Sequence, residues 1–282
     1  MRAVVVDPSG RPVPADVAEP DGPGELVRVR ACGLCGSDVE KLTPAFAGRV
    51  LGHEVVAETA DGRRVALVHH MPCGTCARCR AGRESTCEAF RPDTIVPGGF
   101  AERVRATAGW VDVPDQLDDA RATAVEPLAC VLRGAERVPP GRVLVVGRGF
   151  VGQLFERVLA RRGDDVFGVD ANPARDGRPP DGEVDAVVVC AQGGIDTALE
   201  WLAPGGTLLL FADAGPVPSD PVYRRELTVL GSRSSTPRHM TGAIELLGEL
   251  DLPAPTVLSL SQIEDGLGRL RRGEALKVVL VP

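Results

Sequence analysis

The chain has 282 residues, 44% of them apolar and 25% charged, with a formal net charge of −7. This length allows two domains or one large domain, and the composition is that of an ordinary globular protein. The negative charge argues against a nucleic-acid surface or a polybasic membrane patch, so a small molecule is the expected partner. The chain start lacks a signal-peptide pattern and no window approaches about 18 consecutive apolar residues, which predicts a cytoplasmic protein.

Short apolar runs separated by Gly and Pro predict strands in the first half of the chain, up to about residue 110. These runs are AVVV, LVRVRA, HEVVAE and RVALVHH. From about residue 117 the apolar spacing becomes helical, in DDARATAVEPLACVLRGAERV. The first half is therefore expected to be mostly β.

A rhythm of alternating strands and helices follows. The strands are expected at 142–147, 165–170, 184–190, 206–212 and 226–232. The clearest helices lie in 152–162, 195–203 and 236–250. This alternation predicts a parallel sheet that is covered on both faces. The tail, 254–282, has the pattern of a strand, a helix and a strand, and this pattern fits either half.

A glycine-rich loop, GRGFVG, directly follows the strand at 142–147 and opens a helix. Its G-x-G-x-x-G spacing lets the backbone approach a pyrophosphate at the positive end of the helix. Asp170, at the end of the next strand, is placed to bind the adenosine ribose, which favours NAD; the nearby Arg175 leaves NADP open. A glycine turn without a ligand is the alternative. The predicted cofactor-binding residues are Gly147, Gly149, Phe150, Val151, Gly152, Asp170 and Arg175.

Four cysteines in CGTCARCRAGRESTC follow a C-x2-C-x2-C-x7-C pattern. Four thiolates close a tetrahedron around zinc and leave no position for a substrate, so a structural zinc site is expected. The alternatives are an iron–sulfur cluster or free thiols. A zinc ribbon that binds nucleic acid is disfavoured by the negative charge and by the lack of interleaved aromatic residues. The four ligands would be Cys73, Cys76, Cys79 and Cys87.

A second metal site, with one position left open, can be assembled from other donors in the chain. A catalytic zinc takes three protein ligands of the Cys, His and carboxylate kinds and keeps a fourth position for water or substrate. Cys35, His53 and Glu126 could supply these ligands. Each of the three could equally be structural, and Cys32 with Cys35 also has the C-x-x-C spacing of a redox pair.

Seven segments, in this order, resemble the zinc-dependent medium-chain alcohol and polyol dehydrogenases: CGLCGSD, GHEVV, the four-cysteine segment, GGFAERV, EPLAC, VVGRGFVG and ALKVVL. The EPL and HH-x-PCG-x-C segments are most similar to the sorbitol and threonine dehydrogenase branch. The resemblance covers nearly the whole chain. It implies a GroES-like β-barrel catalytic domain over 1–133, completed by 251–282, and a Rossmann NAD-binding domain over 134–250.

The resemblance also implies a set of metal ligands. Cys35 and His53 match ligands of the catalytic zinc. Glu126 matches a third ligand or a group that holds the zinc-bound water, and Glu54 matches a carboxylate that can enter or leave the coordination shell. With the four-cysteine lobe over 73–87, two zinc ions per chain are expected.

Residues around these ligands take further roles from the resemblance. Ser37 matches the hydroxyl that receives the substrate proton, and Asp38 the carboxylate that orients the histidine ligand. Lys277 matches a basic residue that meets the cofactor phosphates. Cys130 falls where the family lines the nicotinamide pocket, and a small buried residue is its alternative. Glu40 stands where a histidine often relays the proton to solvent; a carboxylate is a weaker acid–base match near neutrality.

The remaining cysteines and histidines are expected to be structural. Cys32 and Cys190 are assigned to the core. His69 and His70 are expected to flank the four-cysteine lobe, and His239 is expected on the surface of a helix.

The chain departs from the family in two stretches. The spacings from Cys35 to His53 and from His53 to Cys73 are short, which trims loops that shape the substrate pocket. The stretch 171–184, ANPARDGRPPDGEV, is too short for a helix and a further strand. The Rossmann sheet should therefore have five strands instead of six, and the adenine pocket loses part of one wall.

The activity implied by the resemblance is oxidation of an alcohol or polyol to a carbonyl by hydride transfer to NAD(P)+. The alternatives are a zinc-free enone or quinone reductase on the same scaffold and a non-catalytic dinucleotide-binding protein. One Tyr, two Trp and seven Phe predict a pocket that is not strongly aromatic, which fits small hydroxylated substrates. The family further implies a homodimer or homotetramer joined through the Rossmann sheet edge near 205–215.

Overall fold

The computed structural model describes residues 1–89, 94–175 and 177–282. It divides into two compact units, one formed by Met1–Ala129 with Ser235–Pro282 and the other by Cys130–Ser234. The expected boundaries fell at 133 and 250, so the largest difference is that residues 235–250 lie in the first unit. None of the helices in the described ranges is long and apolar enough to cross a membrane.

A mostly antiparallel sheet of eight strands forms the first unit, beside a separate antiparallel pair, β1 and β2. The sheet runs in the order β14-β15-β3-β4-β5-β8, with β7 paired to β3 and β6 paired to β7. The strands are β1 (Arg2–Val6), β2 (Pro12–Asp16), β3 (Glu25–Gly33), β4 (Glu54–Glu58), β5 (Arg64–Leu67), β6 (Ile95–Val96), β7 (Arg103–Ala106), β8 (Trp110–Asp112), β14 (Thr256–Ser259) and β15 (Val278–Val281). The expected mostly β first half is confirmed.

Strand β3 shows how the sequence builds this sheet. Val27, Val29 and Ala31 are buried, whereas Arg28 and Arg30 between them point away from the core. This alternation places every second residue on one face of a strand. Residues 31–33 are all buried, so β3 ends inside the unit, just before the CGSD segment.

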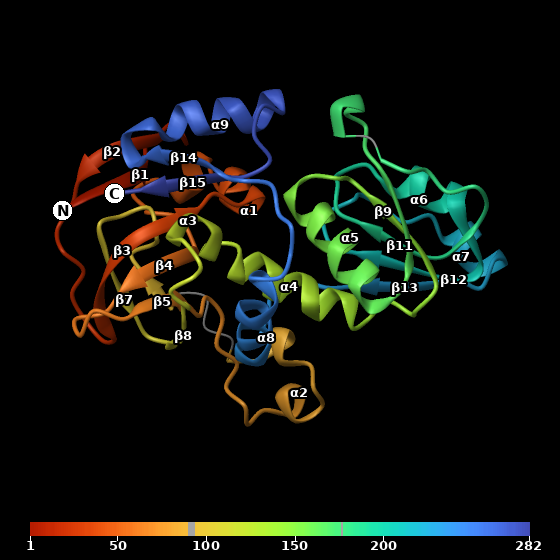
Figure 1. The fold of residues 1–282 in the computed structure, drawn as a ribbon, viewed down its shortest axis with the longest axis horizontal. Helices are drawn as coiled ribbons and strands as arrows, with labels where there is room; N and C mark the ends of the chain where they lie inside the picture. Colours follow the sequence, from red (N-terminus) through yellow and green to blue (C-terminus); the bar gives the residue numbers. More distant parts are fainter. Residues whose placement is uncertain (90–93, 176) are drawn as a thin grey trace. The chain divides into compact units, whose positions relative to one another are not determined.

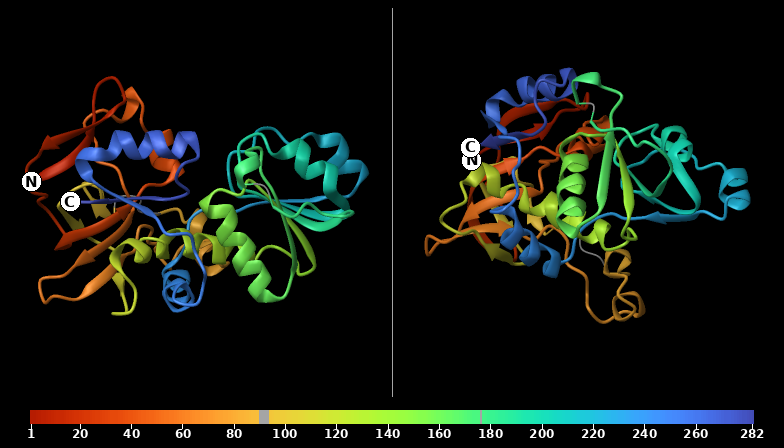
Figure 2. Two further views of the ribbon diagram at one scale, coloured as in Figure 1. Left: turned by 45° about the horizontal axis from the view of Figure 1, so that its top comes forward. Right: turned by 45° about the vertical axis from the view of Figure 1, so that its right-hand side comes forward.

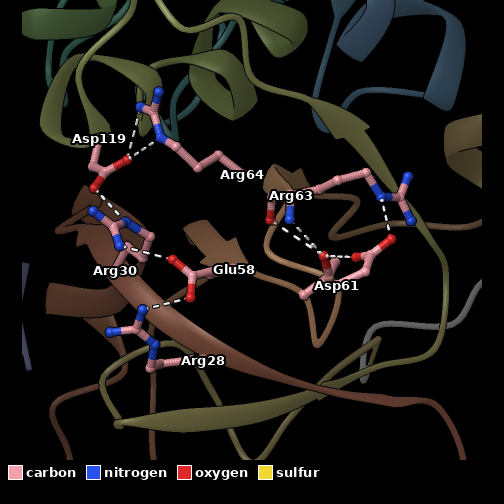
Figure 3. Close-up of polar contacts among 8 residues, drawn as sticks. Arg28, Arg30, Glu58, Asp61, Arg63, Arg64 and Asp119 are labelled. Carbon is pink, nitrogen blue, oxygen red and sulfur yellow. Dashed lines mark hydrogen bonds and ion pairs between the residues drawn. The ribbon is translucent and has the colours of Figure 1, made fainter.

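A network of ion pairs on the polar face ties three strands to one helix (Figure 3). Arg30 bonds Asp119 at 2.6 Å and Glu58 at 2.9 Å, Arg64 bonds Asp119 at 2.8 Å, and Arg28 bonds Glu58 at 2.5 Å. These contacts join β3, β4 and β5 to α3 (Asp119–Ala122). Because the network is partly exposed, its contribution to stability is modest.

Short helices connect the strands of the first unit, and the C-terminal tail completes it. β15 pairs antiparallel with β3, and α9 packs on β14 and β15 (Figure 1). The helices are α1 (Gly36–Glu40), η1 (Pro44–Phe46), α2 (Ala77–Arg80), η2 (Glu84–Thr86), α3, α4 (Val125–Ala135), which continues into the second unit, α8 (Pro237–Leu247), η4 (Leu260–Gln262) and α9 (Ile263–Arg272).

Helix α8 belongs to the first unit because its C-terminal end is bound there. The Arg121 guanidinium donates to the carbonyls of Leu247, at 3.1 Å, and Leu250. The expectation that His239 is a surface residue is wrong: only 4% of it is exposed, and its Nδ1 lies 2.7 Å from the Thr236 hydroxyl. His239 belongs to the buried stripe of α8, whose members recur at helical spacing: His239, Met240, Ala243, Ile244 and Leu247.

The second unit is a parallel sheet of five strands in the order β10-β9-β11-β12-β13. Helices α5 and α6 cover opposite faces of the sheet (Figure 2). Helix α5 connects β9 to β10 toward one edge of the sheet, and α6 connects β11 to β12 toward the other edge. Because connections between parallel strands are right-handed, the two helices lie on opposite faces. The elements are β9 (Arg142–Val146), α5 (Phe150–Arg162), β10 (Asp165–Val169), η3 (Pro173–Arg175), β11 (Val184–Val189), α6 (Ile195–Trp201), β12 (Leu202–Leu210), α7 (Ser219–Arg224) and β13 (Thr228–Gly231).

The prediction of a five-stranded Rossmann sheet is confirmed. Between β10 and β11, the described residues contain only the short turn η3, with no helix or strand that could extend the sheet. β10 is therefore an edge strand.

Candidate active site and metal centres

The four cysteines of the lobe come together in the first unit. Their sulfur atoms lie within 4.8 Å of one another. The loop on which they stand carries α2 (Figure 1). Backbone N–H groups point at the sulfurs, from Cys76 to Cys73 at 3.3 Å, from Cys79 to Cys76 at 3.5 Å and from Cys73 to Cys87 at 3.3 Å. Hydrogen bonds from Thr75 and the backbone lower the pKa of the Cys73 thiol to about 6. Such donors stabilise thiolates, so the lobe fits a closed metal site.

A second donor cluster is buried at the end of β3 and the start of β4. Ligand atoms of Cys35, His53 and Glu54 lie within 4.8 Å of one another. Cys35 caps α1, while His53 and Glu54 stand at the start of β4. Glu126 is buried in the first turn of α4 but is not a member of this cluster among the described residues. Of the four predicted ligands of the open site, the structure thus brings together Cys35, His53 and Glu54, and leaves out Glu126.

Asp38 holds the cluster in shape. Its carboxylate accepts hydrogen bonds from the Cys35 N–H at 3.1 Å and the Gly52 N–H at 3.2 Å, and it lies 3.2 Å from His53 Nδ1. This contact leaves His53 Nε2 available to a metal. Burial lowers the pKa of His53, but the charge and hydrogen bond of Asp38, together with those of Cys35, outweigh it, so the pKa lies well above its usual value. Since zinc binds the neutral ring, metal uptake at these residues releases a proton.

Two further predicted residues lie on the same short helix, α1. The Ser37 hydroxyl donates to the Cys35 sulfur at 3.4 Å, which places it beside the ligand set. Glu40 is exposed at the end of the helix. Cys32, in β3 and four residues before α1, is fully buried, as expected of a core residue.

Glu54 is paired with Lys277, which stands just before β15. The ammonium group bonds the Glu54 carboxylate and the Leu34 carbonyl, the latter at 3.2 Å. Burial lowers the pKa of Lys277, but the Glu54 carboxylate raises it and the net shift is upward. A Cβ on Gly33 would lie 1.9 Å from the Glu54 carboxylate, so only glycine fits there. The predicted contact of Lys277 with cofactor phosphates stays a prediction.

His69 is a site residue that the sequence patterns missed. Its ring stacks on that of His53 with centroids 4.6 Å apart, and on that of His70 at 3.8 Å. Burial, together with His53, lowers the pKa of His69, so its ring is neutral. The antiparallel register that pairs Val56 with Ala66, continued past the strand ends, sets His53 opposite His69. Recognising that β4 and β5 are paired would have revealed this contact.

The glycine loop of the second unit has the geometry of a phosphate cradle. Gly147 has φ of 93°, a left-handed conformation that favours glycine. A Cβ on Gly152 would lie 1.9 Å from the Gly147 carbonyl, and Gly149 caps α5, which begins at Phe150 and Val151. The backbone can therefore approach a pyrophosphate closely at the start of α5.

The two residues expected at the adenosine ribose lie beside this loop. Asp170 accepts from the Arg148 N–H at 2.6 Å and from the Asn172 N–H at 2.8 Å. The Arg175 guanidinium extends to the loop, with Nη1 3.8 Å from the position of a Cβ on Gly149. Cys190, after β11, is largely buried, and burial raises the pKa of its thiol.

The second unit carries a dinucleotide cradle on a parallel sheet. The first unit carries two clusters of metal donors, one closed and one open. Together these features define a zinc- and nicotinamide-dependent oxidoreductase. Comparison with known proteins agrees. Residues 22–115 match the alcohol dehydrogenase GroES-like domain. The chain is 30% identical to D-altritol 5-dehydrogenase of Agrobacterium fabrum over 88% of each chain, and 27% identical to L-galactonate-5-dehydrogenase of Escherichia coli over 83% of each.

A crystal structure of a zinc-binding dehydrogenase of Sinorhizobium meliloti bound to NADP superposes on the chain with a TM-score of 0.83, at 25% identity, covering 100% of this chain and 99% of that one. The chain belongs to the zinc-dependent medium-chain alcohol and polyol dehydrogenase family. It is an enzyme that oxidises an alcohol to a carbonyl with NAD(P)+ and uses zinc.

Proposed function

We propose that Cys35, His53 and Glu54 hold the catalytic zinc and that the four-cysteine lobe holds a structural zinc, two ions per chain. The observation that carries this proposal is the buried cluster of three donor atoms within 4.8 Å, with His53 oriented by Asp38. A thiolate, an imidazole and a carboxylate are ligands of open catalytic sites, whereas four thiolates form closed ones. Glu126 is the alternative third ligand, and Glu54, held by Lys277, is the carboxylate that enters or leaves the coordination shell.

The chain's own side chains move the proton. Zinc, when bound, supplies a Lewis acid that acidifies a substrate hydroxyl, and the nicotinamide supplies the hydride acceptor. Ser37, whose hydroxyl already bonds the Cys35 sulfur, receives the hydroxyl proton. Glu40, exposed on the same helix, passes the proton to solvent. Asp38 keeps His53 in the tautomer that presents Nε2.

The substrate class that fits best is a small polyhydroxylated alcohol. Two relatives are named as dehydrogenases of D-altritol and L-galactonate, both open-chain polyhydroxy compounds. The scarcity of aromatic residues in the chain, with one Tyr and two Trp, supports a pocket for hydroxylated rather than aromatic substrates.

The second unit is assigned to cofactor binding, as the Rossmann domain, and the first unit to catalysis. The pyrophosphate is assigned to Gly147, Gly149 and Gly152 and to the start of α5 at Phe150 and Val151. Asp170 and Arg175 are assigned to the adenosine ribose.

A homodimer or homotetramer is further proposed, together with a cytoplasmic location. The expectation that the sheet edge lies near 205–215 is wrong, because β12 in that stretch is flanked by β11 and β13. The edge strand is β13, and an edge strand offers unpaired backbone groups to a second copy, which supports an oligomer. Val229 on this strand is 37% exposed, and Tyr223 on the preceding helix is 82% exposed. These apolar groups would be covered in such an assembly.

The decisive experiment follows nicotinamide reduction by the purified protein over a panel of polyols, sugar acids, simple alcohols and amino alcohols, with NAD+ and with NADP+. Cys35→Ser is the control, and zinc per chain is measured for both proteins. Turnover with a polyol, two zinc ions in the parent and one in the variant are expected. Absence of turnover throughout the panel, or full activity in the variant, would contradict the proposal.

A further inference from the structure

Lysine occurs at only two positions of the chain, Lys41 and Lys277, among 32 lysine and arginine residues. Lys277 is buried and paired with the Glu54 carboxylate, whereas Lys41 directly follows α1, the helix that Cys35 caps. Within the described part of the chain, Lys41 is half-buried and forms no ion pair. The adjacent Glu40 does not neutralise it, because consecutive residues of a helix do not face each other. Lys41 therefore keeps a charge without a counter-charge.

The face of α1 that carries Lys41 is the face that holds the open donor cluster together. Lys41 comes four residues after Ser37, whose hydroxyl donates to the Cys35 sulfur at 3.4 Å. It comes three residues after Asp38, which lies 3.2 Å from His53 Nδ1. Residues three and four apart are neighbours on a helix surface, and side chains lean toward the helix N-terminus. The Lys41 stem therefore extends back over the turn that carries Ser37 and Asp38.

The charge of Lys41 also acts on the far side of the cluster, at His69. The His69 ring lies 4.6 Å from that of His53, measured between centroids. The pKa of His69 is lowered by burial, by the charges of His53 and His70, and by the Lys41 ammonium. Because salt screens exposed charges over about 8 Å, an ammonium directed away into solvent would act little on this ring. The Lys41 ammonium is thus on the same side of α1 as the cluster.

This ammonium is the charge that the cluster leaves unbalanced. The Cys35 thiolate and the Glu54 carboxylate match the two charges of a divalent metal ion, and a histidine ligand is neutral. The Asp38 carboxylate and the Lys277 ammonium offset each other. The positive charge of Lys41 remains, and an ammonium forms strong, charge-assisted hydrogen bonds with a carboxylate. The surroundings of the cluster therefore favour a substrate that brings a negative charge.

We propose that Lys41 binds a carboxylate of the substrate, so that the enzyme prefers a polyhydroxy acid to the neutral polyol of the same chain length. The proposal rests on the proposed function in one respect, that the substrate alcohol binds at Cys35, His53 and Glu54. Lys41 follows Cys35 by six residues, about 9 Å along the helix, and its stem leans back from there. With bonds of about 1.5 Å, a carboxylate four or five bonds from the reacting carbon is within reach of the ammonium.

The test is titration calorimetry on the full-length, zinc-loaded protein in the presence of NADH. The ligands are pairs that differ in one terminal group: galactonate and galactitol, gluconate and sorbitol, altronate and altritol. Because the cofactor is reduced, no alcohol is oxidised and binding alone is measured. In at least one pair the acid should bind about tenfold more tightly than the polyol. Added salt should weaken the acid and leave the polyol unchanged.

Lys41→Met removes the charge and keeps most of the stem. It should weaken the acid about tenfold or more, because a charge-assisted hydrogen bond is lost, and weaken the polyol less than about threefold. Lys41→Arg keeps the charge and should retain most of the preference for the acid. The ratio of kcat/KM for acid and polyol, measured with NAD+, should change in the same direction in each variant. A merely structural role of Lys41 would not move this ratio.

The matched control is Arg63→Met. Arg63 stands in the turn after β4, a strand that begins at Glu54 and runs away from the cluster, and 51% of its side chain is exposed. The five residues of β4 alone span on the order of 15 Å. The variant removes the same charge from the same unit and should leave the preference for the acid unchanged.

Three outcomes would overturn the proposal. Equal affinity for acid and polyol in every pair would exclude a carboxylate site. Equal losses for both ligands in Lys41→Met would make Lys41 a structural residue, and the same loss of preference in Arg63→Met would assign the effect to overall charge. Oxidation of polyols without a preference for acids would leave the proposed function standing and remove this role of Lys41. Binding of acids through Lys41 without any turnover would support the carboxylate site and contradict the proposed function.

Discussion

The two donor clusters of the first unit contrast in how they are held. The four-cysteine lobe is local: its sulfurs are bonded by N–H groups and a hydroxyl from residues 73–79. The buried cluster depends on distant partners, since Glu54 pairs with Lys277, 223 residues away in the sequence. Four identical donors on one loop suit a site that fixes that loop, whereas unlike donors held from several elements suit a site whose ligands exchange during a reaction.

Removal of one cysteine from each cluster tests this contrast with the largest expected effect. Cys35→Ser should lower kcat about a thousandfold, because a metal Lewis acid contributes several kcal/mol to the transition state. Cys76→Ser should retain a measurable fraction of activity while the lobe becomes susceptible to protease. Each variant should hold one zinc per chain. Equal loss of activity in the two variants would remove the distinction between a catalytic and a structural site.

Breaking the long-range pair should destabilise the first unit. Lys277→Met leaves the Glu54 carboxylate buried without its cation, and about 3 kcal/mol of unfolding free energy should be lost, as for other buried ion pairs that lose one partner. Urea unfolding at neutral pH measures this change. The only other lysine, Lys41, is half-buried at the end of α1, and Lys41→Met serves as the control with a cost of about 0.5 kcal/mol or less. Similar costs for both variants would show that the pair contributes nothing special.

The same contrast explains what could be predicted from the sequence. The lobe and the glycine loop were predictable because each depends on the spacing of cysteines or glycines within one short stretch. The missing sixth strand was predictable from the length of the stretch after Asp170, which is too short for a helix and a strand. The stacking of His69 on His53 and the pairing of Glu54 with Lys277 depend on which strands are neighbours, and no local pattern encodes this. The burial of His239 was missed because a polar residue in the apolar stripe of α8 was read as exposed.

Each of the two clusters contains a hydrogen bond of the same kind, which allows a matched comparison. In each, a hydroxyl two residues after a cysteine donates to its sulfur: Ser37 to Cys35 at 3.4 Å and Thr75 to Cys73 at 3.6 Å. Ser37→Ala should lower kcat about a hundredfold, because a group that transfers a proton in the reaction is lost. Zinc content should stay at that of the parent protein. A loss of zinc together with activity would reassign Ser37 to metal binding alone.

Thr75→Val is the counterpart in the lobe and should have the smallest effect. The side chain keeps its shape and loses only its hydrogen bond to the Cys73 sulfur, a neutral donor worth about 1 kcal/mol, so zinc affinity at the lobe should fall about fivefold. Competition with a chromogenic chelator measures this affinity in the Cys35→Ser background, where the lobe is expected to hold the only zinc. Turnover should be unchanged, because the hydroxyl stabilises a thiolate and moves no proton of the substrate. If Thr75→Val lowered kcat as much as Ser37→Ala, the lobe would have to take part in the reaction, and the division between a local structural cluster and a distributed catalytic one would fail.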